Sequence, residues 1–273
     1  MSFEFLPFAP GPDLEPILDG TFFARGRIPY RSDKILPTGL IPVLFTLGAP
    51  HRMGKSVDPA LNEEFAHSWL EGLQTTPTFN TPTDGTHVIG LLFEPVGLHA
   101  LFGVDMRTLR DRTVDARSVL PARFIAGIEA VYPEASTEAG HAQLRQLIAE
   151  WPRSPLPGWL WRLYREIKQT RGDIDLAGWY AEAGVGARAI VERFKRAVGV
   201  PPKRFCRIHR MLALLEAVDP REAGRGRRRC VTQLGWRPGP PVGPATDFRP
   251  GARPASLPPP RWHPPTTDRR WLR

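Results

Sequence analysis

Two patterns of apolar residues divide the chain near its middle. In about residues 1–135, short β-like apolar runs alternate with Pro and Gly, and the clearest of them are residues 40–47, 69–74 and 87–93. After Pro95 the apolar spacing becomes helical, with residues at i, i+3 and i+4. The apolar positions of this helical pattern are Leu98, Leu101, Phe102, Met106 and Leu109, then Phe124, Ile125, Ile128 and Val131. The first half therefore predicts a β-rich domain with flanking helices.

The second half predicts helices separated by short turns. Its apolar periods predict helices over 159–170, 176–183 and 187–198, followed by a longer helix that starts at Pro201-Pro202. Gly184-Val185-Gly186 predicts the turn between the second and third helices, and Gly199 ends the third. Before this region, Pro152, Pro155 and Pro157 interrupt the pattern and mark a domain boundary.

Residues 220–273 have a different composition. They include 12 Pro in 54 residues and no sustained apolar period, so they cannot bury enough apolar surface to offset chain entropy. We therefore expect an α+β protein in three parts. These are a β-rich N-terminal domain at 1–152, an all-α domain at 158–219 and a disordered tail rich in Arg, Pro and Gly at 220–273.

The net charge of +9 is unevenly distributed along the chain. Residues 220–273 hold 12 Arg against three acidic residues, which accounts for all of it, whereas residues 155–219 carry +5 and residues 1–154 carry −5. Between Arg188 and Arg210 there are eight basic residues and one acidic residue, Glu192. Such an array can neutralise several DNA phosphates. A solvated helix face is the alternative interpretation.

The sequence excludes several classes of function. No apolar run reaches the roughly 18 residues of a transmembrane helix, and residues 1–13 lack the basic region of a secretory signal. We therefore expect a cytoplasmic protein with no membrane partner. Its two cysteines form no disulfide framework, its seven histidines have no metal-binding spacing, and the usual nucleophile and nucleotide motifs are missing. We expect structural or surface histidines, no catalytic residue, no metal, no cofactor and no enzyme activity.

The strongest functional pattern is the helix, glycine-rich turn and helix over about 174–198. This arrangement is typical of a helix-turn-helix that offers its second helix to a major groove. The stretch from Ala183 to Arg210, AGVGARAIVERFKRAVGVPPKRFCRIHR, resembles the first helix-turn-helix and linker helix of AraC/XylS-type transcription regulators. Residues 35–50 and 90–104 are similar to the sensor region of one branch of that family, including its Phe-x-Pro-x-Gly turn. The resemblance covers about residues 1–219.

The resemblance implies roles for individual residues. Helix 187–198 would be the recognition helix, with Arg188, Val191 and Glu192 facing base edges. Arg188 is the first choice for a specific contact, because Arg is the commonest reader of guanine. The implied phosphate contacts are Lys195, Arg196, Lys203 and Arg204. Double-stranded DNA is the implied partner, and the N-terminal domain is implied to sense a small-molecule effector or to mediate homodimer formation.

The chain departs from the family pattern in three places. Gly186 replaces the usual capping Ser, and Glu192 stands where Arg is typical. The second helix-turn-helix of the family is missing, because the pattern stops near Val218; we interpret the tail that follows as a GC-rich gene read out of frame. Two functions therefore remain open. The chain is a sequence-specific transcription regulator, or a truncated relative that binds a ligand or partner and has lost specific DNA recognition.

Overall fold

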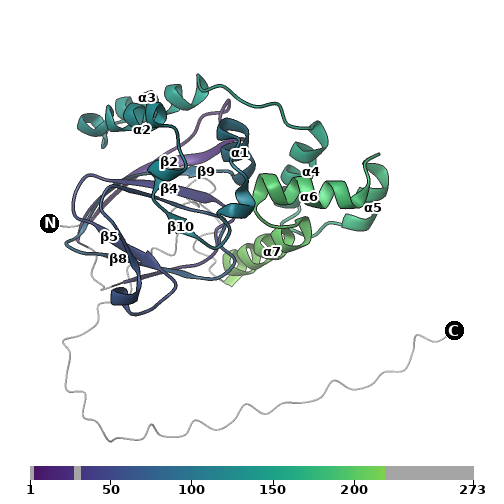
Figure 1. Ribbon diagram of the computed structural model, residues 1–273, viewed down its shortest axis with the longest axis horizontal. Coiled ribbons are helices and arrows are strands. Elements are labelled where there is room, and N and C mark those ends of the chain that lie inside the picture. Colours follow the sequence, from purple (N-terminus) through teal and green to yellow (C-terminus); the bar gives the residue numbers. More distant parts are fainter. Residues whose placement is uncertain (1–2, 28–31, 219–273) are drawn as a thin grey trace, which may run out of the picture. The chain divides into compact units, whose positions relative to one another are not determined.

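Two antiparallel sheets form the N-terminal part of the protein. The computed structural model describes residues 3–27 and 32–218 (Figure 1). Within these residues, a six-stranded sheet has the order β1-β2-β9-β4-β7-β10 and a four-stranded sheet has the order β3-β8-β5-β6. The strands are β1 (Glu4–Phe8), β2 (Leu18–Gly26), β3 (Asp33–Ile35), β4 (Ile41–Thr46), β5 (His51–Gly54), β6 (Glu63–Phe65), β7 (Ser68–Glu71), β8 (Thr78–Pro82), β9 (Thr86–Phe93) and β10 (Thr113–Val114).

The central strands of the larger sheet are apolar on both faces. In β9, Ile89 and Leu91 belong to the core that the helices cover. Val88 and Leu92 point the other way, because successive side chains of a strand alternate, and they belong to a second core between the two sheets. Burial on both faces explains why these strands appear in the sequence as continuous apolar runs. The three predicted strands are confirmed as β4, β7 and β9.

The helices follow the strands along the chain. In the described part of the chain they are α1 (Pro95–Phe102), α2 (Ala122–Glu129), α3 (Glu138–Ala149), α4 (Gly158–Gln169), α5 (Leu176–Glu182), α6 (Ala187–Val198) and α7 (Pro202–Val218). Helices α1 to α3 lie on the outer face of the six-stranded sheet (Figure 1) and contribute to the core there. In this core Phe124 of α2 meets Phe93 of β9. The predicted α+β class, with a β-rich first part and helices after it, is confirmed.

One predicted helix is shorter than its apolar period suggested. The spacing predicted helix as far as Leu109, whereas α1 ends at Phe102. It ends there because Gly103 adopts the left-handed conformation, with φ 67°, that favours glycine. Asp105 then caps a separate 3₁₀ turn, η2 (Met106–Thr108). The turn buries the remaining apolar residues that the period predicted for a helix.

The sheets and the C-terminal helices share one hydrophobic core. Helix α6 packs against α1 and η2, and Phe194 of α6 lies in the same cluster of buried residues as Leu98 of α1. The described residues all fall within one compact unit. A segment without helix or strand, 152–157, which contains the three boundary prolines, separates α3 from α4, and the division into domains stays a prediction. The tail at 220–273, which was predicted to be disordered, lies outside the described residues.

Candidate nucleic-acid interface

Helices α5 and α6 and the turn between them form a helix-turn-helix unit. Asp175 starts α5 by accepting a hydrogen bond from a backbone N–H at 3.0 Å. Gly184 then redirects the chain with φ 64°, a conformation that glycine adopts without steric cost. Gly186 precedes α6 without a side-chain cap, and Gly199 follows it with φ 96°. The helix predicted over 187–198 and its end at Gly199 are confirmed.

One face of α6 is buried against the neighbouring helices. Ile190, Phe194 and Val198 are fully buried, and their spacing of four residues places them on one side of the helix. The Phe194 ring meets the Phe205 ring of α7 edge-on, with the ring centroids 5.8 Å apart. This packing leaves the opposite face of α6 to carry the residues that were predicted to read bases.

Of the three predicted base-reading residues, Arg188 and Glu192 lie on that opposite face, and Val191 lies at its border with the buried face. Arg188, Val191 and Glu192 are spaced i, i+3 and i+4, so they follow one another along one side of the helix. Arg188 and Glu192 are exposed, and Val191 is half-buried. We name these three residues the reading stripe.

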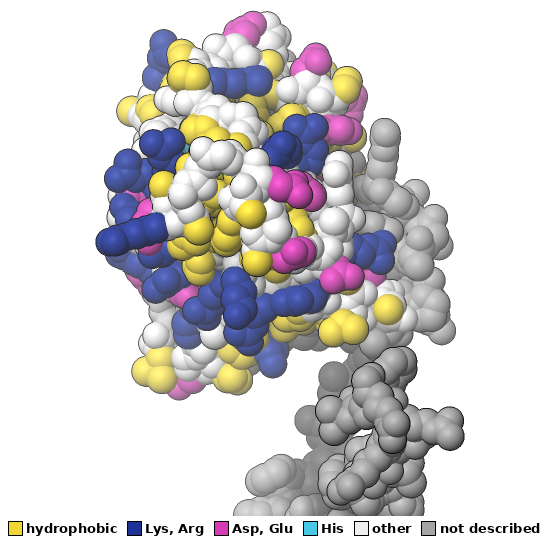
Figure 2. Space-filling model, turned by 90° about the vertical axis from the view of Figure 1, so that its right-hand side faces the viewer, with side chains coloured by type: hydrophobic (Ala, Val, Ile, Leu, Met, Phe, Trp, Pro, Cys, Tyr) yellow, Lys and Arg dark blue, Asp and Glu magenta, His cyan; other side chains and the backbone are white. Residues whose placement is uncertain are grey.

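The four predicted phosphate-contacting residues lie where α6 ends and α7 begins. Lys195 and Arg196 are in the last turn of α6, and Lys203 and Arg204 are in the first turn of α7. All except the half-buried Lys195 are exposed. Figure 2 looks onto this side of the molecule and shows Lys and Arg side chains gathered in a band across it.

Three of the predicted DNA-contacting residues also contact the N-terminal part. The contacts are an ion pair of Glu192 with Arg107 at 3.6 Å, an ion pair of Arg196 with Asp105 at 3.8 Å, and a hydrogen bond from Arg204 to the Thr75 hydroxyl at 2.9 Å. Hydrogen bonds from Arg107 lower the pKa of Asp105, and Arg196 adds to the effect. A hydrogen bond from Lys195 lowers the pKa of Glu192. Both carboxylates are therefore ionised at neutral pH, and η2 borders the reading stripe with charged side chains.

A buried ion pair joins the start of α1 to α4. The Glu94 carboxylate is 2% exposed and accepts hydrogen bonds from the Tyr164 hydroxyl and the Lys168 ammonium group. Burial raises the pKa of Glu94, and the charge of Lys168 opposes that shift. These contacts hold α4, the helix that precedes the helix-turn-helix, against the N-terminal part. The sequence had shown Glu94 only as a variable position within the Phe-x-Pro-x-Gly turn.

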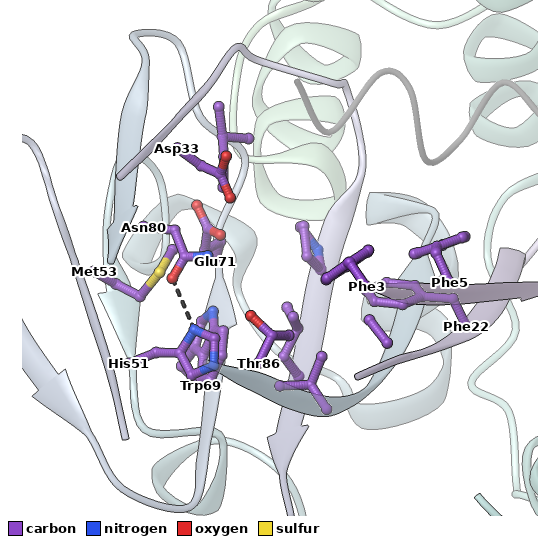
Figure 3. Close-up of a pocket in the computed structure, with 15 residues that line it drawn as sticks. Phe3, Phe5, Phe22, Asp33, His51, Met53, Trp69, Glu71, Asn80 and Thr86 are labelled. Atoms are coloured by element: carbon purple, nitrogen blue, oxygen red, sulfur yellow. Dashed lines mark hydrogen bonds between the residues drawn. The ribbon is translucent and has the colours of Figure 1, made fainter. Parts of the chain in front are cut away.

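A second candidate site is a cavity of about 80 Å³ between the two sheets. Figure 3 shows the side chains of Asp33, His51, Glu71 and Asn80 together at one end of it, and the rings of Phe3, Phe5 and Phe22 at the other. The sequence had not revealed this site, because its polar residues come from four different strands. The one available signal was Glu71, an acidic residue that follows the apolar pair Trp69-Leu70 in a short strand and lies on the same face as Trp69.

The polar end of the cavity contains buried titratable groups. Burial raises the pKa of Glu71 to about 7, although a hydrogen bond from the Thr78 hydroxyl and the charge of Lys55 oppose the shift. Burial lowers the pKa of His51, so its ring is neutral at pH 7. The His51 Nδ1 atom lies 2.9 Å from the Asn80 Oδ1 atom. The Nε2 atom of His51 and the Nε1 atom of Trp69 are buried without a hydrogen-bond partner among the described residues.

One of the histidines is part of the buried core. His141 is fully buried between the Thr21 hydroxyl and the Ala135 carbonyl oxygen, which is a structural role. No cluster of three or more His, Cys, Asp or Glu side chains that could hold a metal ion occurs in residues 3–27 and 32–218. None of the helices described in the structure is both long and apolar enough to cross a bilayer.

Comparisons with known proteins give one match to a family model and several to solved structures. Residues 7–115 match the model of a domain of unknown function, DUF6597. A search of curated proteins gave no match. Among solved structures, apo ToxT of Vibrio cholerae strain SCE256, in a variant form, is similar with 9% identity and a TM-score of 0.40, over 80% of this chain and 83% of that chain.

Two further solved structures are similar to the chain. The AraC-like transcriptional activator CuxR has 15% identity and a TM-score of 0.31, over 79% of this chain and 96% of that chain. ToxT of Vibrio cholerae O395, bound to a methylnaphthalenyl butenoic acid, has 9% identity and a TM-score of 0.37, over 80% of this chain and 86% of that chain.

Proposed function

We propose that the protein is a DNA-binding transcription regulator of the AraC type and that α6 enters a major groove. The reading stripe on α6, bordered by the basic residues of α6 and α7, is the observation that carries this proposal. A recognition helix requires this arrangement, because side chains from one face must reach the base edges while cations beside them meet phosphates.

Each side chain of the reading stripe suits a particular base. Arg188 can donate two parallel hydrogen bonds to O6 and N7 of guanine, and Val191 offers an apolar contact for the methyl group of thymine. Glu192 can accept a hydrogen bond from the amino group of cytosine. Lys195, Arg196, Lys203 and Arg204 are the proposed phosphate contacts, and their contribution to affinity is independent of sequence and sensitive to salt.

The N-terminal part is proposed to sense a small-molecule effector or to mediate homodimer formation. The cavity between the sheets offers a place for an effector. Coupling to DNA would pass through η2, because Arg107 and Asp105 pair with Glu192 and Arg196, two residues that would otherwise be available to DNA.

Duplex binding tests the proposal. The full-length chain is titrated, at two salt concentrations, with the DNA upstream of its own gene and with a scrambled duplex of equal length. We expect a preference for the upstream duplex that Arg188→Ala removes, with a loss of about ten- to a hundredfold in affinity for it. The matched control is Arg153→Ala, an exposed arginine in the segment between α3 and α4, which should leave the preference unchanged.

A second candidate function is that of a truncated relative that has lost specific DNA recognition. The observation in its favour is the last turn of α7, where Leu214 and Leu215 are 68% and 43% exposed in the region where the family pattern stops. Equal and salt-sensitive binding of both duplexes, unchanged by Arg188→Ala, would favour this second function and reject the first.

A further inference from the structure

Two exposed arginines of the N-terminal part lie beside the helices of the candidate interface. Arg107 and Arg110 belong to residues 105–112, which contain η2 and end just before β10. We name these residues the arginine loop. The Arg107 Nη1 atom lies 3.6 Å from the Glu192 carboxylate of the reading stripe. Neither arginine was predicted to contact DNA, because no local pattern in the sequence shows that this loop packs beside α6.

The arginine loop is held in place by its backbone and its buried side chains. Met106 and Leu109 are buried in the core that the loop shares with α6. The Met106 carbonyl oxygen lies against Gly199, where a Cβ atom would be only 3.0 Å from it. The Arg112 carbonyl oxygen accepts a hydrogen bond from the Gly72 N–H group at 2.9 Å. The position of the loop beside the end of α6 is therefore fixed by the fold.

The loop also adjoins the start of α7. Arg204 donates a hydrogen bond to the Thr75 hydroxyl at 2.9 Å, and that hydroxyl donates to the Asp111 carboxylate at 2.8 Å. The Arg110 Nε atom lies 3.8 Å from the same carboxylate. Arg110 is thus linked through two neighbours to one of the predicted phosphate contacts. The loop extends the basic surface of α6 and α7 onto the N-terminal part.

Both arginines can bind a further acceptor. A guanidinium group carries five N–H donors, and Arg107 uses its Nε and Nη2 atoms on Asp105. Arg110 faces Asp111 with its Nε atom, and Asp111 already accepts a hydrogen bond from the Thr75 backbone N–H group at 2.6 Å. Ion pairs as exposed as these are weak and can exchange for a phosphate, which takes two parallel hydrogen bonds from an arginine.

The dimensions of DNA favour a phosphate as that acceptor. An α-helix with its side chains is about 10–12 Å across, and the major groove is about 12 Å wide. If α6 enters the groove it fills it, so a group directly beside the reading stripe meets the wall of the groove. Phosphates line that wall. Arg107, which is within ion-pair distance of Glu192, is placed at this border.

We propose that the arginine loop is a second DNA-binding element, in which Arg107 and Arg110 contact backbone phosphates beside the groove that α6 enters. Arg107 then exchanges Glu192 for a phosphate, and the Glu192 carboxylate becomes available to a base. The inference rests on the proposed function and deepens it. The N-terminal part supplies affinity that is independent of sequence, while α6 supplies the discrimination between sequences.

A double variant, Arg107→Gln with Arg110→Gln, tests the proposal in the full-length chain. Its affinity for the upstream duplex and for the scrambled duplex is measured at four salt concentrations. The logarithmic slope against salt should become shallower by about 0.9 for each lost phosphate contact, and affinity for both duplexes at 0.1 M salt should fall by about five- to fiftyfold. The ratio of the two affinities should not change. Arg107→Lys with Arg110→Lys should retain most of the slope, because lysine keeps the charge.

The matched control is Arg25→Gln with Arg27→Gln. These arginines also belong to the N-terminal part and pair with carboxylates, but they lie on and just after β2, whereas β10 is at the opposite edge of the six-stranded sheet. The control removes the same charge and should leave the slope unchanged. An unchanged slope in the Arg107 and Arg110 variant, an equal change in the control, or a gain in affinity would overturn the proposal. Because the slope is measured on the scrambled duplex as well, a failure of sequence preference rejects the proposed function separately.

Discussion

At the scale of single residues, Glu71 makes folding depend on pH. Its pKa is about 7 in the folded protein against an ordinary 4.5, so between these values the folded state holds a proton that the unfolded state releases. The free energy of unfolding should therefore fall as pH rises from about 4.5 to about 7, by up to about 3 kcal/mol from this group. Below that window the group is protonated in both states and imposes no penalty.

Glu71→Gln should remove this contribution, because an amide does not titrate and its oxygen still accepts from Thr78. Urea unfolding at pH 5 and pH 8 measures the effect as a difference between wild type and variant, in which other titrating groups cancel. We expect the free energy of unfolding to fall less between pH 5 and pH 8 in the variant than in the wild type. Equal losses in the two proteins would show that Glu71 is ionised throughout this range.

The buried ion pair of Glu94 with Lys168 provides a second test at this scale. Lys168→Met should leave the Glu94 carboxylate buried without its cation and lower the free energy of unfolding by about 2–4 kcal/mol at pH 8. The loss should be smaller at pH 6, because a buried carboxyl group with a raised pKa can take up a proton. Lys203→Met on an exposed site is the control, and a loss of equal size there would contradict the argument.

At the scale of elements, the sequence predicted those whose ends carry strong local signals. Helix α6 was placed to the residue because Gly186 and Gly199 bound it, and α7 begins at the predicted Pro202. Strands β1, β2, β3, β5, β6, β8 and β10 were not predicted. Each of them is short or includes Gly or Pro, so no sustained local period marks them, and pairing across the sheets stabilises them.

The difference between local sequence signals and tertiary packing also explains which parts of the candidate sites could be predicted from the sequence. The reading stripe follows from spacing on one helix, so its members could be named from the resemblance and are found on one face. The cavity depends on the register of strands β3, β5, β7 and β8, which no local pattern fixes. The contacts of η2 with α6 likewise arise from tertiary packing.

Those contacts lead to a prediction about η2 as an element. Asp105→Asn should raise affinity for DNA by about two- to fivefold, because it frees Arg196 and removes an acidic group beside the reading stripe, while Asn still caps the turn. Titration of the full-length chain with duplex DNA measures the change. Asp58→Asn, which alters the aspartate that caps another 3₁₀ turn, η1 (Pro59–Leu61), should have no effect. A decrease in affinity with Asp105→Asn would show that the ion pair supports DNA binding.

At the scale of the whole molecule, the shared core determines how the two parts can communicate. Besides the shared core, the polar contacts of the N-terminal part with the C-terminal helices include the buried Glu94 interactions with α4 and the exposed charged contacts of η2 with α6. The exposed pairs are weak and can exchange for phosphate, whereas the buried pair is costly to break. A change of DNA affinity is therefore expected to involve the contacts of η2 while those of α4 persist.

The distribution of charge gives the last prediction. Residues 220–273 carry +9, which equals the whole net charge of the chain. The +5 of residues 155–219, which contain the reading stripe, is cancelled by the −5 of residues 1–154. If the arginines of 220–273 meet phosphates, a chain that ends at residue 219 should show a shallower dependence of affinity on salt, by about 0.9 in the logarithmic slope for each phosphate that is no longer neutralised. Its ratio of affinities for the upstream and scrambled duplexes should be unchanged, because binding to phosphates adds affinity without discriminating between sequences. Binding measured at four salt concentrations separates the two quantities. A loss of the ratio on truncation would instead place sequence recognition in residues 220–273 and remove it from α6.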